Sequence, residues 1–327
     1  MRNIQQIPFY VAIIVLTFLG VGCEQEDDTP PTPSESGWVR YEQNPILRDV
    51  YPGGAYESAS DGHVFYDDEG RLKMIYSGDH EDRSSIKLAS GNSLTDWSVT
   101  KPLLFEPNTL NLDINKETAF YRKAKNGKHQ IFYIGYPDGT TYQSQIFLAE
   151  ADSLEGPYTQ IANPVVPRGE IAGKDVYLIT SPSVVEHEDL LYMVFLGWND
   201  DPQNVSNVWV IGATSGDDGY TWSNFQEVET PIGMEGQVTQ APDGSFVAVR
   251  TGEDLGMEAL YYATSNHPFG PWDNDPDPIL VEDGSILEKD EVIAPQITFD
   301  PQTGEAYLFY TGADHLTGWW MMLARKE

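Results

Sequence analysis

One phrase of sequence occurs five times along the chain, at intervals of roughly 55–65 residues. Each copy has the pattern of an apolar strand, a turn and a second strand that ends near a glycine. The copies span residues 60–78, 117–135, 181–197, 236–252 and 294–312. Four copies are followed by a third strand, a turn and an aromatic residue. Repeated units of four short strands are typical of β-propeller blades, so the sequence predicts an all-β fold with five blades.

The two ends of the chain favour a closed ring. The fifth unit stops after its third strand, "WWMMLARKE", and the missing aromatic strand is found near the N-terminus in residues 37–47. This strand places Trp38 where the other units carry Trp97, Tyr158, Trp222 and Trp272. We therefore expect a five-bladed β-propeller closed by the N-terminal strand in the last blade, which leaves no open sheet edge. The alternative is an open array of β-meanders.

The first 22 residues are typical of a targeting segment. Arg2 precedes a long apolar stretch, and the segment ends at Gly22-Cys23. A single cysteine at this place resembles a bacterial lipoprotein processing site, so we expect a signal peptide over residues 1–22 and lipidation of Cys23. An uncleaved membrane anchor is the alternative. Cys23 is also the only cysteine, which excludes an intramolecular disulfide.

Residues 23–36 are acidic and rich in proline, and they contain too little apolar surface to fold. We expect them to form a disordered linker, and residues 37–327 to form one catalytic-type propeller domain. An acidic run after a lipoprotein cysteine resembles a signal for display on the outer membrane, although a plain spacer would have the same composition. The predicted location is therefore the outer membrane or cell surface, or else the periplasmic face.

The chain has 19 basic and 51 acidic residues and a net charge of −32. This charge argues against nucleic acid as a partner, because phosphate binding needs clustered lysine and arginine. We expect no required cofactor. A structural calcium ion would suit the many oxygen ligands, but the spacing of an EF-hand loop is absent from the sequence.

Propeller geometry predicts which loops form the functional face. The first strand of each blade lines the axis, so the loop before it and the loop between the second and third strands open on the same face. The latter loops are rich in Asp, His, Asn, Tyr and Trp, as in "SGDHEDRSS" and "TGADHLTGWW". Polar groups for hydroxyls and flat rings for apolar sugar faces are typical of a carbohydrate site. We therefore expect an oligosaccharide or polysaccharide as the ligand.

Two carboxylates stand out by position. Asp61 leads the first strand of blade one, in "SDGHV", and Glu235 leads that of blade four, in "GMEGQV". Both are predicted to project toward one pocket near the axis. Hydrolysis of a glycosidic bond uses two such groups, one as acid and one as base or nucleophile. The alternative is that Asp61 caps a turn and that Glu235 is merely solvated.

At these motifs, residues 37–327 resemble the five-bladed glycosidases of glycoside hydrolase family 43 and its relatives, families 32 and 68. "Ser-Asp-Gly-His-Val" is similar to the blade-one element that carries the general base, and "Met-Glu-Gly-Gln-Val" to the blade-four element that carries the general acid. The resemblance implies Asp61 as base and Glu235 as acid in an inverting hydrolysis of an arabinose- or xylose-type glycan.

One position departs from that family. Its third acid lies in a blade-three element that reads Thr180-Ser181-Pro182-Ser183 here, so Ser181 stands in place of an aspartate. Asp175 and Glu117 are candidates to replace it, and Glu117 is expected at the position of blade two that is equivalent to Asp61. The loss also allows a propeller that binds glycans without cutting them. A glycoside phosphorylase is a third hypothesis, but the few cations on the predicted face count against a phosphate pocket.

Further candidates for substrate binding lie on the same predicted face. They include the two Asp-His pairs of blades one and five, the blade-three serine, a tryptophan and an arginine that ends a strand of blade four. These residues are Asp79, His80, Ser181, Trp198, Arg250, Asp314 and His315. Ordinary loop polarity, strand packing or an ion pair would explain each of them singly.

Overall fold

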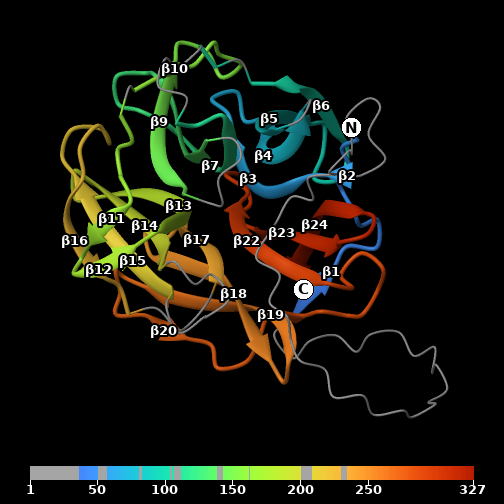
Figure 1. The fold of residues 1–327 in the computed structure, drawn as a ribbon. Coiled ribbons are helices and arrows are strands. Elements are labelled where there is room, and N and C mark those ends of the chain that lie inside the picture. The colour runs from blue at the N-terminus through green and yellow to red at the C-terminus, as the bar shows by residue number, and fades with distance from the viewer. Residues whose placement is uncertain are drawn as a thin grey trace, which may run out of the picture.

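A computed structural model describes residues 37–327 except 51–56, 81–82, 104, 107–111, 138–142, 162, 200–207 and 230–233. The predicted signal peptide, Cys23 and the linker lie outside the described residues. Those residues form strands and turns, and none of them belongs to a helix that could cross a membrane. Five sheets surround a central axis (Figure 1), which confirms the prediction of an all-β five-bladed propeller.

The first three blades each contain four antiparallel strands in sequence order. Blade one contains β3 (Ser60–Tyr66), β4 (Leu72–His80), β5 (Arg83–Gly91) and β6 (Trp97–Pro102). Blade two contains β7 (Asn115–Lys123), β8 (His129–Tyr136), β9 (Gln145–Ala151) and β10 (Thr159–Gln160). Blade three contains β13 (Leu178–His187), β14 (Leu190–Trp198), β15 (Val208–Ser215) and β16 (Ser223–Glu227). A separate hairpin of β11 (Gly169–Ile171) and β12 (Lys174–Val176) precedes blade three.

The last two blades each carry one extra short strand. Blade four contains β17 (Met234–Gln240), β18 (Phe246–Asp254), β19 (Met257–Ser265) and β20 (Asp273–Asn274), with β21 (Leu280–Val281) also on β19. Blade five contains β22 (Glu291–Phe299), β23 (Ala306–Asp314), β24 (Gly318–Lys326) and β1 (Trp38–Arg40), with β2 (Glu57–Ser58) parallel to β24. The first strand of each blade lies innermost in the ring (Figure 1).

The outer strand of blade five comes from the N-terminal side of the domain. β1 pairs antiparallel with β24, and Trp38 lies opposite Lys326. Arg40 on this strand donates to both carboxylate oxygens of Glu288, at 2.8 and 2.6 Å. The hydroxyl of Tyr310 donates to the same carboxylate at 2.7 Å, and Glu288 is fully buried. The first and last segments of the domain are thus joined by backbone and buried side-chain bonds.

A carboxylate on the leading loop of three blades accepts a hydrogen bond from a buried tyrosine on the second strand of the same blade. The pairs are Tyr76 with Asp49, Tyr133 with Asp113 and Tyr310 with Glu288, at 2.7–2.9 Å. These bonds hold the segments that lead into the innermost strands. Arg250 occupies the corresponding position of blade four, two residues before a glycine, as the tyrosines do.

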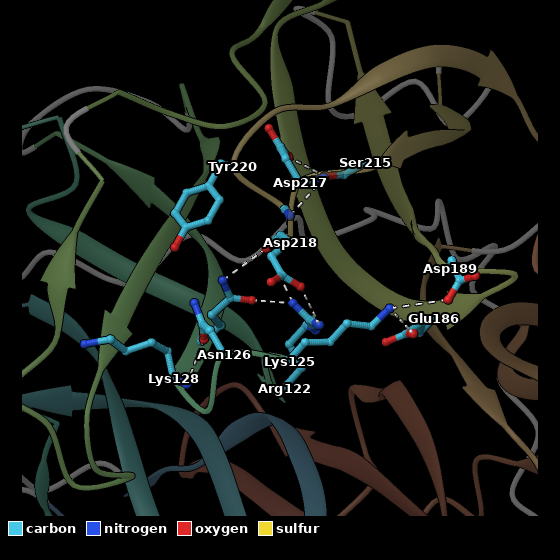
Figure 2. A network of polar contacts seen from close by, with 12 residues as sticks. Arg122, Lys125, Asn126, Lys128, Glu186, Asp189, Ser215, Asp217, Asp218 and Tyr220 are labelled. Atoms are coloured by element: carbon cyan, nitrogen blue, oxygen red, sulfur yellow. Dashed lines mark hydrogen bonds and ion pairs between the residues drawn. The ribbon is translucent and has the colours of Figure 1, made fainter.

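On the face opposite the predicted site, ion pairs join blades two and three (Figure 2). Lys125 Nζ lies 2.8 Å from Oε1 of Glu186, and Arg122 lies 3.4 Å from Oδ1 of Asp218. Buried Gln130 donates to Glu150 at 2.6 Å in the same network. The basic side chains that gather here therefore already have acidic partners.

Candidate active site

Each innermost strand contains a β-bulge at the same position, and the bulged residue has a positive φ. These residues are Asp61 (51°), Thr118 (48°), Ser181 (53°), Glu235 (43°) and Ala294 (50°). A residue other than glycine rarely adopts this conformation, and bulges re-aim a side chain at barrel rims and active sites. Because all five blades share the bulge, the conformation belongs to the architecture. Blades one and four place carboxylates at it.

A glycine follows each of these two carboxylates, and close packing against backbone atoms requires the one in blade four. A Cβ atom on Gly62 would lie 2.5 Å from Cε of Met321. A Cβ atom on Gly236 would overlap the carbonyl oxygen of Val249 and lie 2.8 Å from Cα of Arg250. The backbone of the neighbouring strand therefore approaches β17 directly behind Glu235, which a larger residue would prevent.

Hydroxyl groups from adjacent blades fix the backbone of three bulges. The backbone N–H of Asp61 donates to Oγ1 of Thr311 in blade five at 3.1 Å. The N–H of Thr118 donates to Oγ of Ser77 in blade one at 2.9 Å, and the N–H of Ala294 donates to Oγ1 of Thr251 in blade four at 3.2 Å. Each bond crosses a blade boundary, so ring assembly itself positions the bulged residues.

Asp61 is a buried carboxylate with hydroxyl partners. Its side chain is 4% exposed, and Oγ of Ser60 donates to its Oδ2 at 2.9 Å. Burial raises the pKa of Asp61, whereas hydrogen bonds from Ser60 and Ser77 act in the opposite direction. Burial alone would favour the protonated carboxyl of Asp61, and the two hydrogen bonds shift its equilibrium back toward the ionised form.

Glu235 lies in a different environment. Its Oε2 atom is shut off from solvent and has no hydrogen-bond partner among the described residues. Burial raises its pKa well above the ordinary value, and the charges of Asp61, Glu291, Glu258 and Glu117 raise it further. The structure thus brings Asp61 and Glu235 within electrostatic reach of each other, as the sequence predicts. We call Glu235 and the four acids that act on it the acidic cluster, whose members are Asp61, Glu117, Glu235, Glu258 and Glu291, from blades one, two, four and five.

Glu117 belongs to the acidic cluster but not at the predicted position. The residue equivalent to Asp61 is Thr118, so the sequence alignment of blade two was wrong by one residue. The hydroxyl of Tyr136 donates to Oε1 of Glu117 at 2.7 Å. Burial raises the pKa of Glu117 to about 7, and hydrogen bonds from Ser84 and Tyr136 oppose part of this effect. Burial also raises the pKa of neighbouring Asp79.

Blade five contributes Glu291 of the acidic cluster, which the sequence analysis missed, and its partner His315. Glu291 is buried at the start of β22, and Nε2 of the predicted candidate His315 lies 2.7 Å from its Oε1. The imidazole packs on Trp319 with ring centres 5.4 Å apart. Burial raises the pKa of Glu291, opposed by the bond from His315, and that bond raises the pKa of His315. The sequence feature that could have identified Glu291 is an acidic residue at the start of an innermost strand, in "EVIAP".

Glu258 is the second carboxylate that the sequence analysis did not select. It stands at the start of β19, and its Oε2 accepts the backbone N–H of Val292 at 2.6 Å. Burial raises its pKa to about 8, and the charge of Glu291 adds to the effect. The bond places Glu258 beside β22, so the acidic cluster continues across the boundary between blades four and five.

Three other sequence candidates have well-defined surroundings. Ser181 is buried at the bulge of blade three, the exact counterpart of Asp61 and Glu235. Trp198 is 3% exposed and packs in an apolar cluster, so its ring does not present an open platform for a sugar. The guanidinium of Arg250 lies over the ring of Tyr261 at 4.6 Å, and burial lowers its pKa to about 10.

The remaining candidates occupy other positions than the bulges of the innermost strands. Asp175 is exposed on β12 of the separate hairpin, outside the five sheets. Asp314 accepts the N–H of Leu316 at 2.9 Å within its own turn, and this bond lowers its pKa. The Asp-His pairs of blades one and five are not equivalent, because Asp79 aligns with Ala313 in strand register. His80 therefore corresponds to Asp314, at the end of the second strand.

Among the described residues, no group of three or more His, Cys, Asp or Glu side chains has an arrangement suited to a metal ion. The acidic cluster is spread over four blades, and its oxygens are partly committed to Ser60, Tyr136, His315 and the backbone of Val292. These donors compete with a cation for the same oxygens. A calcium ion in the propeller stays a prediction from the sequence.

No protein-family model matches the chain, and no curated protein matches it in sequence. Solved structures match in fold. A thermostable family-43 glycoside hydrolase has a TM-score of 0.62 and 15% identity, over 82% of this chain and 88% of that one. The α-L-arabinofuranosidase from Podospora anserina, in complex with cellotriose, has a TM-score of 0.65 and 11% identity, over 89% and 97%.

A third similar structure belongs to family 130, a family of mannoside phosphorylases that contains glycoside hydrolases targeting β-1,2-mannosidic linkages in Candida mannan. It has a TM-score of 0.63 and 13% identity, and covers 91% of this chain and 96% of that one. The predicted resemblance to five-bladed glycosidase propellers is confirmed at the level of the fold. At such identities, function depends on the residues of this chain's own site.

Proposed function

We propose that this protein is a glycoside hydrolase in which Glu235 is the general acid and Asp61 the general base. One observation carries the proposal. The two carboxylates occupy equivalent bulges of blades four and one, interact electrostatically, and have unequal environments. Such asymmetry between paired titratable groups is how enzymes divide acid and base roles at one pH.

The environments assign the roles. Glu235 has a buried oxygen without a donor among the described residues and several negative neighbours, which favour its protonated form, so it can give a proton to the leaving oxygen. Asp61 has hydroxyl donors from Ser60 and Ser77, which favour its ionised form as a proton acceptor.

In the proposed reaction, Asp61 takes a proton from a water molecule, whose oxygen bonds to the anomeric carbon. The bond from that carbon to the leaving oxygen breaks, and the leaving oxygen receives the proton of Glu235. We propose an inverting outcome on an arabinose- or xylose-type glycan, which requires room for the water between the carboxyls, about 6.5–9.5 Å. The fold likeness to an arabinofuranosidase supports this substrate class.

Binding of a glycan without cleavage is the second candidate function. The observation that favours it is Ser181, which leaves the bulge of blade three without the carboxylate that blades one and four carry. In that case the acidic cluster would serve as a set of hydrogen-bond acceptors for sugar hydroxyls. A phosphorylase on the same fold is the remaining alternative.

The test uses the full chain with arabinan, xylan and the 4-nitrophenyl arabinofuranoside and xyloside, each with and without inorganic phosphate. Hydrolysis predicts free sugar without phosphate, and NMR of the first product gives its anomeric configuration. Asp61→Asn and Glu235→Gln should each lose about 10²–10⁴-fold in kcat on the polymers, the usual contribution of acid–base catalysis. The exposed residues Asp243 and Glu42 provide matched controls, Asp243→Asn and Glu42→Gln.

Two results would contradict hydrolysis, and a third would contradict the assignment of the base. Retention on immobilised glycan without any product would favour the binding protein, and product that forms only with phosphate would favour a phosphorylase. Full activity of Asp61→Asn would remove the proposed base.

We also propose that lipidation of Cys23 holds the domain at the outer membrane or cell surface, with residues 23–36 as the tether. The thiol at the end of an apolar segment supports this location. Expressed with its leader, the protein should sediment with membranes and incorporate labelled palmitate. Cys23→Ser should abolish the label, and a labelled Cys23→Ser protein would contradict the proposal.

A further inference from the structure

A hydrogen bond crosses the ring directly beneath the two proposed catalytic residues. His63 and Gln237 each stand two residues after Asp61 and Glu235 on their strands. The Nδ1–H of His63 donates to Oε1 of Gln237 at 3.1 Å. The bond therefore joins β3 to β17, and these strands belong to blades that are not neighbours in the ring. We call the pair the axial bridge.

The axial bridge is well held on the side of His63. This residue is 6% exposed, and its ring centre lies 4.1 Å from that of Phe120 and 5.7 Å from that of Phe65. Burial lowers the pKa of His63 to about 4, so the imidazole is neutral at pH 7. The contacts with the two phenylalanine rings hold the imidazole in place against Gln237.

The other glutamine at this level of the axis serves a different purpose. Gln296 occupies the equivalent position of blade five, and its amide bonds to both the N–H and the carbonyl of Val64. It therefore joins blades five and one, which already share a boundary. Gln296 thus joins neighbouring blades, whereas the bond between His63 and Gln237 links the strand of Asp61 with the strand of Glu235.

We propose that the axial bridge sets the separation of the Asp61 and Glu235 carboxyls, and that His63 and Gln237 are positioning residues for the reaction. The inference rests on the proposed function. Two residues of strand span about 7 Å, so the axial bridge lies about that far along the two strands from Asp61 and Glu235. The separations that predict inversion and retention differ by as little as about 1 Å. A small change at the bridge would therefore alter the catalytic geometry.

Gln237→Met tests the proposal, because methionine keeps the length of the side chain and removes the acceptor. Loss of the tether should let the carboxyls move apart. We expect kcat to fall on the order of 10–100-fold with KM changed less than threefold, because misplacement by about 1 Å has effects of this size. The repulsion between the carboxyls weakens as they separate, so the alkaline limb of the kcat/KM profile should move to lower pH. The charged groups facing Glu235 are Asp61, Glu117, Glu258 and Glu291.

Gln130→Met is the matched control, because Gln130 is a buried, hydrogen-bonded glutamine of the network on the opposite face. It should lower the melting temperature without moving the pH profile. His63→Phe should resemble Gln237→Met, and the double variant should lose no more than either single variant, because both remove one bond.

A crystal structure of Gln237→Met supplies a readout besides activity. An unchanged separation of the Asp61 and Glu235 carboxyls would overturn the proposal, and so would kinetic effects no larger than those of Gln130→Met. If the unaltered protein cleaves no glycan, the proposed function fails, whereas a changed carboxyl separation would still support the axial bridge.

Discussion

His315 and Glu291 form a charged pair beside the proposed acid, with Nε2 of the imidazole 2.7 Å from Oε1 of the carboxylate. Burial raises the pKa of Glu291 and the bond from His315 opposes this effect, so the bond favours the ionised carboxylate, whose negative charge in turn favours the protonated form of Glu235. Blade five lies between blades four and one in the ring, so this charge acts on both catalytic strands from the side opposite Ser181.

Replacement of Glu291 by Gln should narrow the pH range of activity from the alkaline side. Loss of a negative charge lowers the pKa of Glu235, so the acid loses its proton at a lower pH than in the unaltered protein. We expect the alkaline limb of the kcat/KM profile to move down in pH, with a larger loss of rate at pH 8 than at pH 5. Rates measured from pH 4 to 9 would test this.

His315→Gln should move the same limb in the same direction, because loss of the bond from His315 raises the pKa of Glu291 and favours its uncharged form. The double variant should then behave as Glu291→Gln does. Glu42→Gln, on an exposed residue, should leave the limb in place. An alkaline limb unaffected by either change would mean that the pair does not influence Glu235.

His63 should make the protein less stable in acid. Its pKa is about 4 in the folded protein and returns to its ordinary value of 6.5 on unfolding. The unfolded chain therefore binds the extra proton between these values, and stability falls as pH decreases through this window. The difference corresponds to about 3 kcal/mol.

The measurement is the free energy of unfolding by urea at pH 7 and at pH 4.5. His63→Gln should lose about 2–3 kcal/mol less between the two pH values than the unaltered protein does. Carboxylates such as Asp61, whose pKa values are raised on folding, act in the opposite direction in both proteins and so cancel in the comparison. Equal losses in both proteins would show that His63 is not the group responsible.

The blade count and the positions of Asp61 and Glu235 could be predicted from the sequence because both depend on local, repeated patterns. Apolar strands alternate with turns at a regular interval, and the two acids stand at the same place in that repeat. A repeat of this kind carries information about the ring, since equivalent residues of each unit face the same axis.

The predictions that failed, and the residues that were missed, depended on the register of a strand to within one residue and on contacts between distant segments. The bulge makes Thr118, and not Glu117, the counterpart of Asp61, and no sequence pattern marks an extra residue in a strand. The pairing of Glu291 with His315, and of His63 with Gln237, arises only when the ring is assembled. Trp198 was expected on the open face, but its ring is buried by side chains of its own blade and of the segment before it.

Gly236→Ala should impair both folding and activity. The added methyl group would overlap the carbonyl oxygen of Val249, and backbone atoms cannot move aside as a flexible side chain can. Overpacking of this kind typically costs about 1–3 kcal/mol, and here it displaces the strand that carries Glu235. The melting temperature and kcat should both decrease.

Gly216→Ala is the control for that change, because a Cβ atom there would meet its nearest neighbour at 3.7 Å, an ordinary contact. Its melting temperature and activity should stay close to those of the unaltered protein. A Gly236→Ala protein with normal stability and rate would contradict the close backbone approach behind Glu235.

Arg40→Met should destabilise the whole ring, because it leaves the carboxylate of Glu288 buried without its cation, with the hydroxyl of Tyr310 and the backbone N–H of Asp283 as its neutral donors. Removing one member of a buried ion pair costs about 3–5 kcal/mol. Arg71→Met removes the ion pairs of an arginine that is 62% exposed, so the expected loss of stability is much smaller. Urea unfolding of the two variants gives both values. Adding Glu288→Gln to Arg40→Met should recover part of the loss, since no buried charge then remains. Equal costs for the two arginines would mean that β1 contributes little to closing blade five.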